Sequence, residues 1–410
     1  MVAERTELCI AGGGPAGMMA GLLFARAGVE TLVLEKHGDF LRDFRGDTVH
    51  PSTLRLFSEL GLLDRFLERP HNRIQRIGFD SATDHFEIGD LSAFDPRWNF
   101  IALMPQWEFL DFVADEARTY PKFRLQMNAE ATDLIEEGGR IVGVRVEHEG
   151  RPYDVRSRLV IAADGRGSAL RDLAGLERTV LGAPIDVFWF RIPKPVDKET
   201  GVAGFFRSGR IMVLLDRGTY WQCAYVFPKG AADEVRARGL TAFRDDVAHV
   251  APILAEGVGA IAGWEDVKLL TVALDRLERW HRPGFLVIGD AAHAMSPIGG
   301  VGINVAIQDA VAAANLLAGP MARGEDLDPL LDRVERRRRL AVRTIQAFQN
   351  GAQQRIIRPL LAGNGPVKPP WIAFVLDRIP LLRRLPAAFL GFGIRPEHVR
   401  SPAAARRGTG

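Results

Sequence analysis

The chain has 410 residues, 47% of them hydrophobic and 25% charged, which is the composition of a folded globular protein with two or three lobes. Its 53 basic and 51 acidic side chains nearly cancel, and we expect no nucleic-acid partner. No uninterrupted apolar run approaches the roughly 20 residues that cross a bilayer, and the start lacks the layout of a signal peptide, so the cytoplasm is the expected location.

The first predicted element is a strand at residues 6–11, followed by glycines, the helix-like stretch MMAGLLFARAG and a second strand, TLVLE. Gly12, Gly14 and Gly17 form a GxGxxG pattern between this strand and the helix. The first glycine permits a tight turn, the second lets a pyrophosphate approach, and the third lets the helix pack on the strand. The N–H groups at the helix start then suit a phosphate.

Glu35 ends the second predicted strand, 18 residues after Gly17, where a carboxylate can accept a hydrogen bond from a ribose hydroxyl. An acid at this position disfavours a 2′-phosphate, so the resident dinucleotide is expected to be FAD or NAD. Pro15, Ala16 and Lys36 adjoin these residues and are further candidate contacts of the cofactor.

Further strands are predicted at 141–147 and 158–163, and the second of these leads into Asp164 and the motif ADGRGSALR. Taken alone, this motif fits a strand, an Asp-Gly turn and a helix cap. Residues 181–275 then hold several aromatic and β-branched runs between glycines and prolines, which predict a second, mostly antiparallel sheet. Cys9 and Cys223 fall in predicted buried strands, so both are expected to be small core residues.

The strand predicted at 284–289 runs directly into Asp290, and a loop with Gly299, Gly300 and Gly302 follows. A carboxylate at a strand end and bare backbone amides further on suit two parts of one ligand. A helix beginning near Ile303 would also present N–H groups and a positive dipole end to negative charge.

Past Gly319 the chain is predicted to be helical and basic, with 17 Lys and Arg against 7 Asp and Glu in residues 321–410. We interpret the run at 333–339, RVERRRR, as solvated helix surface rather than a site for an anionic partner. The apolar, basic segment 371–399 is expected to cap a substrate cavity rather than lie on a membrane, because Pro380 and Pro386 divide it.

The motifs GGGPAG, ADGRGSALR and GDAAHAMSPIGGVGIN, in this order and at these separations, resemble the class A flavoprotein monooxygenases, the aromatic-ring hydroxylases of the para-hydroxybenzoate hydroxylase type. The resemblance covers roughly residues 5–320. It implies an α/β fold: an FAD-binding Rossmann-like domain of the GR2 type, an inserted and mostly antiparallel β-sheet substrate domain, and a helical C-terminal segment. The expected division is an FAD domain at 1–75, 100–180 and 276–320, a substrate domain at 76–99 and 181–275, a helical region at 321–400 and a disordered tail at 401–410.

The resemblance also implies roles for individual residues. Asp290 would bind the ribityl chain of FAD, and the loop and helix start would meet the isoalloxazine ring. Arg45 and Gln106 match residues that hold FAD in the family. The complete set of implied contacts adds Asp164, Pro297, Gly300, Gly302, Ile303 and Asn304. Val301 and Ile303 depart from the family pattern, which often has a polar residue and a methionine there.

The implied activity is hydroxylation of an aromatic or similarly electron-rich apolar small molecule through a flavin C4a-hydroperoxide, with O2 and a transiently bound NAD(P)H as co-substrates. Because the flavin carries the chemistry, the resemblance requires neither a catalytic triad nor a metal, and none is expected. Two alternatives stay open: an FAD-dependent reductase or dehydrogenase similar to geranylgeranyl reductases, and a flavin-binding protein without turnover. Dependence on oxygen separates them.

The residues that face the substrate are the least determined part of the prediction. Alternation in TYWQCAYVF places Tyr220 and Gln222 on one face of a strand, where they could bond a phenolic substrate, although ordinary sheet packing explains them as well. His50 and Arg210 are weaker candidates, and His293 is expected to be structural. A homodimer is compatible with the sequence, and membrane contact is not expected.

Overall fold

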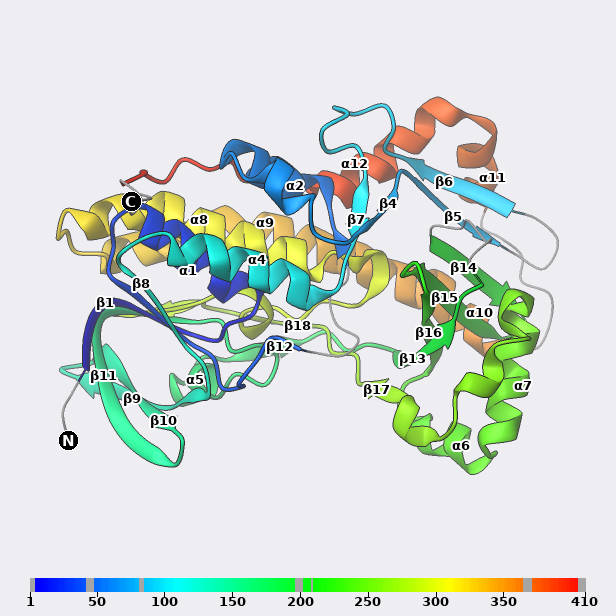
Figure 1. The fold of residues 1–410 in the computed structure, drawn as a ribbon, viewed down its shortest axis with the longest axis horizontal. Coiled ribbons are helices and arrows are strands. Elements are labelled where there is room, and N and C mark those ends of the chain that lie inside the picture. Colours follow the sequence, from blue (N-terminus) through cyan, green and yellow to red (C-terminus); the bar gives the residue numbers. More distant parts are fainter. Residues whose placement is uncertain are drawn as a thin grey trace.

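The computed structural model describes residues 4–41, 48–80, 85–195, 202–207, 209–363 and 371–404. Figure 1 shows a larger lobe, in which helices lie over a mostly parallel sheet, joined to a smaller lobe built on a second sheet. The elements of both lobes come from several separated parts of the sequence.

The large sheet has the strand order β19-β20-β11-β1-β2-β8, and β10 and β9 extend it from β11. Strands β20, β11, β1, β2 and β8 run parallel to their neighbours in this order. The C-terminal parts of β1 and β11 and all of β2 and β20 are buried and largely apolar, as expected for parallel strands covered on both faces, whereas β8 at the edge is less buried. The strands span β1 (Glu4–Ala11), β2 (Thr31–Leu34), β8 (Phe123–Gln126), β9 (Ala129–Glu137), β10 (Arg140–His148), β11 (Arg151–Ala162), β19 (His281–Arg282) and β20 (Phe285–Val287).

Helices α1 (Pro15–Arg26), α4 (Gln106–Arg118), α8 (Gly302–Ala322) and α9 (Asp328–Ala352) form the layer over one face of this sheet. Helix α1 packs against both α4 and α8, and α8 packs against α9. The segment Ile298–Ala322 is long and apolar enough to cross a membrane, but 78% of its apolar window is buried inside the protein. Its composition is that of a core helix surrounded by other helices and the sheet.

The second sheet has the order β17-β13-β16-β15-β14-β5-β6 and is antiparallel except where β14 meets β5. One face packs against α6 (Ala232–Ala237) and α7 (Leu240–Val250), helices that the sequence did not predict. Cys223 is buried on this face and Cys9 in the large sheet, so their prediction as core residues is confirmed. The strands span β5 (Arg76–Asp80), β6 (His85–Asp90), β13 (Ile185–Pro193), β14 (Val202–Arg207), β15 (Arg210–Asp216), β16 (Tyr220–Pro228) and β17 (Lys268–Leu270).

A small sheet of β3 (Thr48–Val49), β7 (Ile101–Leu103) and β4 (Asn72–Ile74) lies between the lobes. The remaining elements of the first 300 residues are α2 (Pro51–Glu59), α3 (Leu63–Phe66), α5 (Ala169–Leu173), β12 (Arg178–Val180) paired with β18 (Asp275–Leu277), and the short turns η1 (Pro252–Leu254), η2 (Val258–Ala260), η3 (Trp264–Asp266), η4 (Gly289–Ala291) and η5 (Ile298–Gly300).

After α9 the chain continues through η6 (Gln353–Ile357), α10 (Arg358–Ala362), α11 (Trp371–Arg378), η7 (Pro380–Arg383) and α12 (Arg384–Phe392). Helices α11 and α12 pack against β6. The interpretation of 333–339 as solvated surface is wrong for part of the run, because Arg338 is only 2% exposed and Glu335 is buried beside it. The prediction of a disordered tail is wrong for 401–404, since the N–H of Ala404 donates to the Arg26 carbonyl at 2.6 Å; residues 405–410 lie outside the described residues.

Candidate flavin site

The carboxyl ends of β20, β11, β1 and β2 meet at one edge of the large sheet. Ala11 of β1 is paired with Ala162 of β11 and with Leu34 of β2, and Ala162 is paired in turn with Val287 of β20. Neighbouring strands lie about 4.8 Å apart, so residues that follow these ends become neighbours. They are the predicted cofactor residues Asp290, Asp164, Gly12 and Glu35.

The three glycines after β1 differ in the space around them. A Cβ on Gly12 would lie 2.4 Å from the Ala163 carbonyl oxygen, and one on Gly17 would lie 1.9 Å from that of Gly12. Neither position has room for a side chain, because the backbone of the turn and of α1 already lies against its neighbours. A Cβ on Gly14, in contrast, would meet no atom of the protein within 4 Å. Gly14 is also the N-cap of α1 and supplies no side-chain cap, so the helix start faces open space suited to a pyrophosphate.

Glu35 is buried at the end of β2 and is tied to the glycine turn. Its Oε2 accepts the Gly13 N–H at 2.9 Å, and its Oε1 accepts the His37 N–H at 3.0 Å. These bonds orient the group beside the glycine turn, the position at which a carboxylate suits a ribose hydroxyl. The neighbouring Lys36 is 55% exposed and lies 3.7 Å from Glu130, on the surface rather than in the turn.

Two aspartates follow adjacent strands at this edge of the large sheet. Within the described part of the chain, the buried Oδ1 of Asp164 has no hydrogen-bond partner, and desolvation raises the pKa of this carboxyl. Asp290 is about one-third exposed, and its Oδ2 lies 3.0 Å from Nε of Arg166. Arg166 is a residue that the sequence analysis missed. It stands within ADGRGSALR, but nothing in the local pattern indicated which carboxylate it would meet.

The loop before α8 adopts backbone conformations that glycine provides most easily. Gly299 has φ +78° and Gly300 has φ +62°. A Cβ on Gly300 would lie 2.5 Å from Oγ1 of Thr48, whose hydroxyl donates to the Gly300 carbonyl at 2.8 Å. Pro297 precedes the η5 turn, and Gly302 and Ile303 open α8. The glycines therefore leave backbone groups as the surface of this loop, and the N-terminus of α8 follows directly in the chain.

Asn304 fastens this loop to the segment that begins at β3. Its Oδ1 accepts the His50 N–H at 2.9 Å and the Thr53 hydroxyl at 2.8 Å, while its Nδ2 donates to the Thr48 carbonyl at 3.0 Å. These bonds use both lone pairs of the amide oxygen and one of its two N–H donors. Asn304 therefore holds in place the loop that is expected to meet the flavin ring.

His50 is completely buried beside the same loop. Its Nδ1 lies 2.8 Å from the Leu390 carbonyl oxygen, which requires an N–H at that atom. Burial lowers the pKa of the ring from its ordinary 6.5 to about 4, although the carbonyls of Leu390 and Gly300 act in the opposite direction. His50 is therefore neutral at pH 7 and forms part of the wall of the site.

The remaining predicted cofactor contacts are Gln106 and Arg45. Gln106 is the first residue of α4 and is buried where that helix begins. Since α4 packs on α1, its N-terminus belongs to the same lobe as the glycine turn. Arg45 lies outside the residues that the structure describes.

The substrate candidates fall on opposite faces of the second sheet. Arg210 contacts the Tyr225 hydroxyl at 3.1 Å and Asp246 of α7 at 2.9 Å, so it is engaged on the helix-covered face. Gln222 lies on the other face. Its Oε1 accepts from Nε of Arg217 at 3.0 Å, which orients the amide, and its buried Nε2 has no partner among the described residues.

Trp189 is a second donor on the Gln222 face, and the sequence analysis missed it. It stands opposite Ala224, two residues from Gln222 along β16, and adjacent positions of this kind share a face. Within the described structure its indole Nε1 is buried and unpartnered. Tyr220 lies at the end of the same strand, with the Arg191 guanidinium 5.2 Å from its ring centre.

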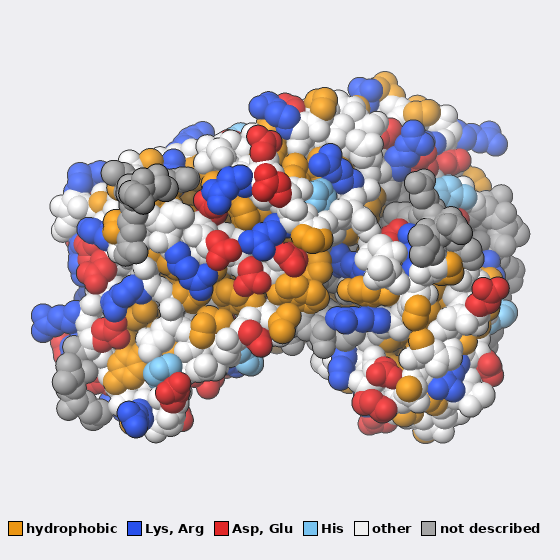
Figure 2. Space-filling model, viewed as in Figure 1, with side chains coloured by type: hydrophobic (Ala, Val, Ile, Leu, Met, Phe, Trp, Pro, Cys, Tyr) orange, Lys and Arg blue, Asp and Glu red, His pale blue; other side chains and the backbone are white. Residues whose placement is uncertain are grey.

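The small sheet links this face to the glycine loop. Leu103 pairs with Thr48 on one side and with Asn72 on the other, and Asn72 donates to the Asp216 carbonyl at 2.8 Å. Leu103 also shares an apolar cluster with Leu215, which stands opposite Gln222. Contacts from Leu215 through Leu103 to Thr48 therefore connect the strand opposite Gln222 to the loop at Gly300, across the small sheet. Figure 2 shows a notch between the lobes on the lower side of the molecule.

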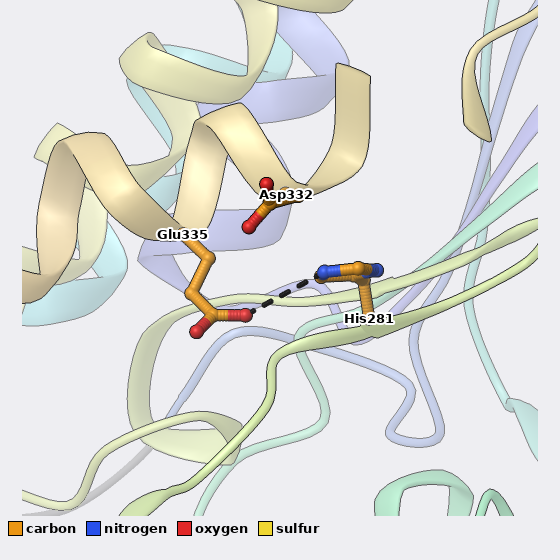
Figure 3. Close-up of side chains that lie close together, drawn as sticks. All are labelled: His281, Asp332 and Glu335. Carbon is orange, nitrogen blue, oxygen red and sulfur yellow. Dashed lines mark ion pairs between the residues drawn. The ribbon is translucent and has the colours of Figure 1, made fainter. Parts of the chain in front are cut away.

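One group of side chains has the composition of a metal site: His281 of β19 with Asp332 and Glu335 of α9 (Figure 3). The His281 Nε2 atom lies 3.7 Å from a Glu335 oxygen. Both carboxylates are already neutralised, because Arg336 lies 2.7 Å from Asp332 and Arg339 contacts Glu335. Glu335 also accepts the Trp280 N–H at 3.0 Å. The group fits ion pairs within α9 that His281 approaches from β19.

Comparison with known proteins agrees with this geometry. A family model described as an FAD binding domain matches residues 5–349. The chain is 31% identical over 340 residues to 6-methylpretetramide 4-monooxygenase of Streptomyces rimosus, which covers 82% of this chain and 80% of that protein. It is 28% identical over 355 residues to the 12-dehydrotetracycline 5-monooxygenase/anhydrotetracycline 6-monooxygenase of Streptomyces rimosus subsp. rimosus, covering 82% and 67% of the two chains.

Among solved structures, p-nitrophenol 4-monooxygenase from Pseudomonas putida has the same fold, with a TM-score of 0.76 at 18% identity over 96% of this chain and all of that one. The residues present also fit FAD. The turn at Gly14 leaves room for a pyrophosphate, and Asp164 has a buried oxygen without a partner among the described residues. Asp290 and the glycine loop lie at the two ends of the segment that joins β20 to α8. The chain belongs to the FAD-binding-domain family and is an FAD-dependent monooxygenase of the class A aromatic-hydroxylase type.

Proposed function

We propose that this monooxygenase hydroxylates an aromatic compound whose oxygen substituents accept hydrogen bonds from Gln222 and Trp189, in the class of 6-methylpretetramide and anhydrotetracycline, the compounds named for its relatives. The observation that carries the proposal is the pair of buried donors without partners on one sheet face. Unsatisfied buried donors cost stability, so they are retained where a ligand satisfies them.

The Gln222 amide has a defined orientation. Because Arg217 donates to its Oε1, the Nε2 group is directed away from Arg217 and can only donate. A carbonyl, phenol or phenolate oxygen of a substrate would complete its bonding. The indole of Trp189 is likewise a donor only. The site thus selects substrates that present acceptor oxygens along one edge.

The rest of this face is apolar. Val213 and Leu215 stand next to Ala224 and Gln222 across the β15–β16 pair, and they belong to the same clusters as Trp189. A flat aromatic ring can pack on such a surface. Ala387 of α12 joins the cluster that contains Leu215, which supports a capping role for the segment 371–399 over this site.

FAD, when bound, supplies the electron transfer from NAD(P)H and the activation of O2. The protein's own contribution is to bind and orient both ligands and to exclude water. Asp290, the glycine turn and the loop at Gly300 would hold the cofactor, and the face of Gln222 and Trp189 would position the ring to be hydroxylated.

The division into an FAD domain, an inserted substrate domain and a C-terminal cap follows the same proposal, with the boundaries given by the sequence. NAD(P)H would bind transiently, since a second dinucleotide motif is not found in the sequence. A homodimer and a cytoplasmic location are proposed on the sequence alone.

The deciding experiment measures NAD(P)H oxidation by the FAD-loaded enzyme with a panel of fused aromatic compounds, with and without acceptor oxygens on one edge. We expect stimulation only by the oxygenated compounds, and incorporation of one atom from 18O2 into the product. A product labelled only from water, or turnover that persists without O2, would favour the reductase alternative, to which a 24% identical digeranylgeranylglycerophospholipid reductase belongs.

A further inference from the structure

Asp309 of α8 is fully buried and joins separate parts of the chain. Its Oδ2 accepts the Gly289 N–H at 3.1 Å and lies 2.6 Å from Nε2 of His293, while its Oδ1 accepts from Nε of Arg338 at 2.9 Å. One carboxylate therefore connects the end of β20, the turn after it, and helix α9.

The position of these partners matters because Gly289 directly precedes Asp290. Gly289 has φ +64°, and a Cβ there would lie 3.0 Å from that of Ala16, so this point of the backbone is held close to α1. Asp309 lies on the helix that begins at Gly302. The bond from Gly289 to Asp309 consequently ties the strand end that presents Asp290 to the helix whose start carries the glycine loop.

The two halves of the proposed flavin contact stand at opposite ends of residues 289–304. Loop backbones drift unless their ends are fixed, and a binding group displaced by about 1 Å lies outside the roughly 0.5 Å within which a binding site must be held. The hydrogen bonds of Asp309 directly connect these two halves, because they join α8 to Gly289 and His293.

We propose that Asp309 is a positioning residue for FAD, which fixes the spacing between Asp290 and the loop at Gly300–Asn304 through its bond to Gly289. The proposal rests on the assignment of the flavin site. It extends that assignment to a residue that has no access to the cofactor.

The charges around Asp309 agree with a permanently ionised carboxylate. Burial alone would raise its pKa, but His293 and Arg338 hold the pKa below its usual value. Arg338 also faces Glu397 at 3.9 Å, and Glu397 is bound by Arg337 at 2.7 Å. The cluster thus holds alternating positive and negative groups, with Arg338 shared between two carboxylates.

The test compares Asp309→Ala with Arg338→Met. Alanine has no acceptor atom, so all three donors around position 309, the Gly289 N–H among them, lose their partner. Arg338→Met removes the same buried ion pair while leaving the bonds to Gly289 and His293 intact. Both variants are expected to lower the melting temperature of the apoprotein.

The readouts are the dissociation constant for FAD, followed by quenching of flavin fluorescence, and the visible absorption and circular dichroism of the bound flavin. Both are measured at a temperature at which circular dichroism shows folded apoprotein. We expect at least tenfold weaker FAD binding and an altered flavin spectrum for Asp309→Ala, and binding within threefold of the wild type for Arg338→Met.

If Asp309→Ala alone does not fold, the double variant Asp309→Ala/Arg338→Met removes both buried charges and is compared with Arg338→Met. At least fivefold weaker FAD binding by the double variant supports the proposal. Equal binding by these two, or an equal loss in Arg338→Met and Asp309→Ala, overturns it, because affinity would then follow global stability. Failure of the wild-type protein to bind FAD would instead refute the flavin-site assignment.

Discussion

Arg166 Nε lies 3.0 Å from Asp290 Oδ2, so the carboxylate assigned to the ribityl chain is held by a residue of the turn after β11. Both side chains are about one-third exposed, and the pair is free to rearrange when a ligand arrives. The contact places Asp290 toward the neighbouring strand end, where the rest of the dinucleotide site lies.

Replacing Asp290 by Ala should weaken FAD binding by about 10- to 100-fold, because a hydrogen bond to a charged group contributes roughly 1.5–3 kcal/mol. The dissociation constant is measured by fluorescence quenching. Asp290→Asn, which can still accept a hydroxyl, should lose less. Asp233→Ala, which removes a carboxylate that is 96% exposed on α6 in the other lobe, serves as the control. Unchanged flavin content in Asp290→Ala would contradict the assignment.

The glycines at 14 and 17 should behave differently when each is changed to Ala. Gly17→Ala would force a Cβ to 1.9 Å from a backbone oxygen, so the apoprotein should be strongly destabilised. Gly14→Ala meets no protein atom and has φ −74°, which alanine adopts freely, so its apoprotein should unfold at the wild-type urea concentration. Its FAD affinity should nevertheless fall, since the methyl group would occupy the space assigned to the pyrophosphate. Normal FAD binding by Gly14→Ala would argue against that placement.

Asn304→Ala should destabilise the apoprotein by about 2–4 kcal/mol, because the buried His50 N–H, the Thr53 hydroxyl and the Thr48 carbonyl would each lose a partner. Thr48→Val removes one hydrogen bond, the one to the Gly300 carbonyl, and should lower the free energy of unfolding by about 1 kcal/mol. Urea unfolding of the apoproteins measures both effects. A loss in Asn304→Ala no greater than in Thr48→Val would mean that the loop is fixed by other contacts.

Acid should destabilise the protein through His50. Its folded-state pKa of about 4 lies below its ordinary 6.5, so the unfolded chain binds the proton first and stability is lost as pH falls from 6.5 toward 4. The full difference corresponds to about 3 kcal/mol. His50→Gln should flatten this part of the stability–pH curve. His281→Gln serves as a comparison, since burial also lowers the pKa of His281 and its loss should flatten the curve less. Identical slopes for wild type and His50→Gln would contradict the burial argument.

Gln222→Leu should raise the KM for an oxygenated aromatic substrate by about tenfold and increase NADPH or NADH consumption without product, because the substrate oxygen would lose its donor. The FAD affinity should not change. Tyr225→Phe removes a hydroxyl on the opposite face of the same strand and is the control, expected to have near wild-type KM. Equal effects of the two substitutions would remove the special role of the Gln222 amide.

Much of the flavin site could be predicted because its signals are local. A glycine turn, an acid at the end of a strand and a helix start are each set by a few consecutive residues, and parallel strands bring their carboxyl ends to one edge. The places of Gly12, Glu35, Asp164 and Asp290 after strand ends were therefore predictable without knowing the packing, and their contacts with FAD stay a prediction. The surface interpretation of the arginine run failed at Arg338 because helical periodicity does not reveal which side of a helix faces a buried aspartate.

The sequence by itself determined the dinucleotide-binding strand ends, the glycine loop before α8 and the antiparallel character of the second sheet, since backbone conformation and side-chain alternation are encoded over short windows. Only the tertiary structure decided that Arg166 meets Asp290, that Asn304 holds Thr48 and Thr53, that Asp309 is buried between β20 and α9, and that Gln222 and Arg210 face opposite ways. Most of these contacts join residues far apart in the chain, and all depend on which side chains the packed core leaves within hydrogen-bonding distance.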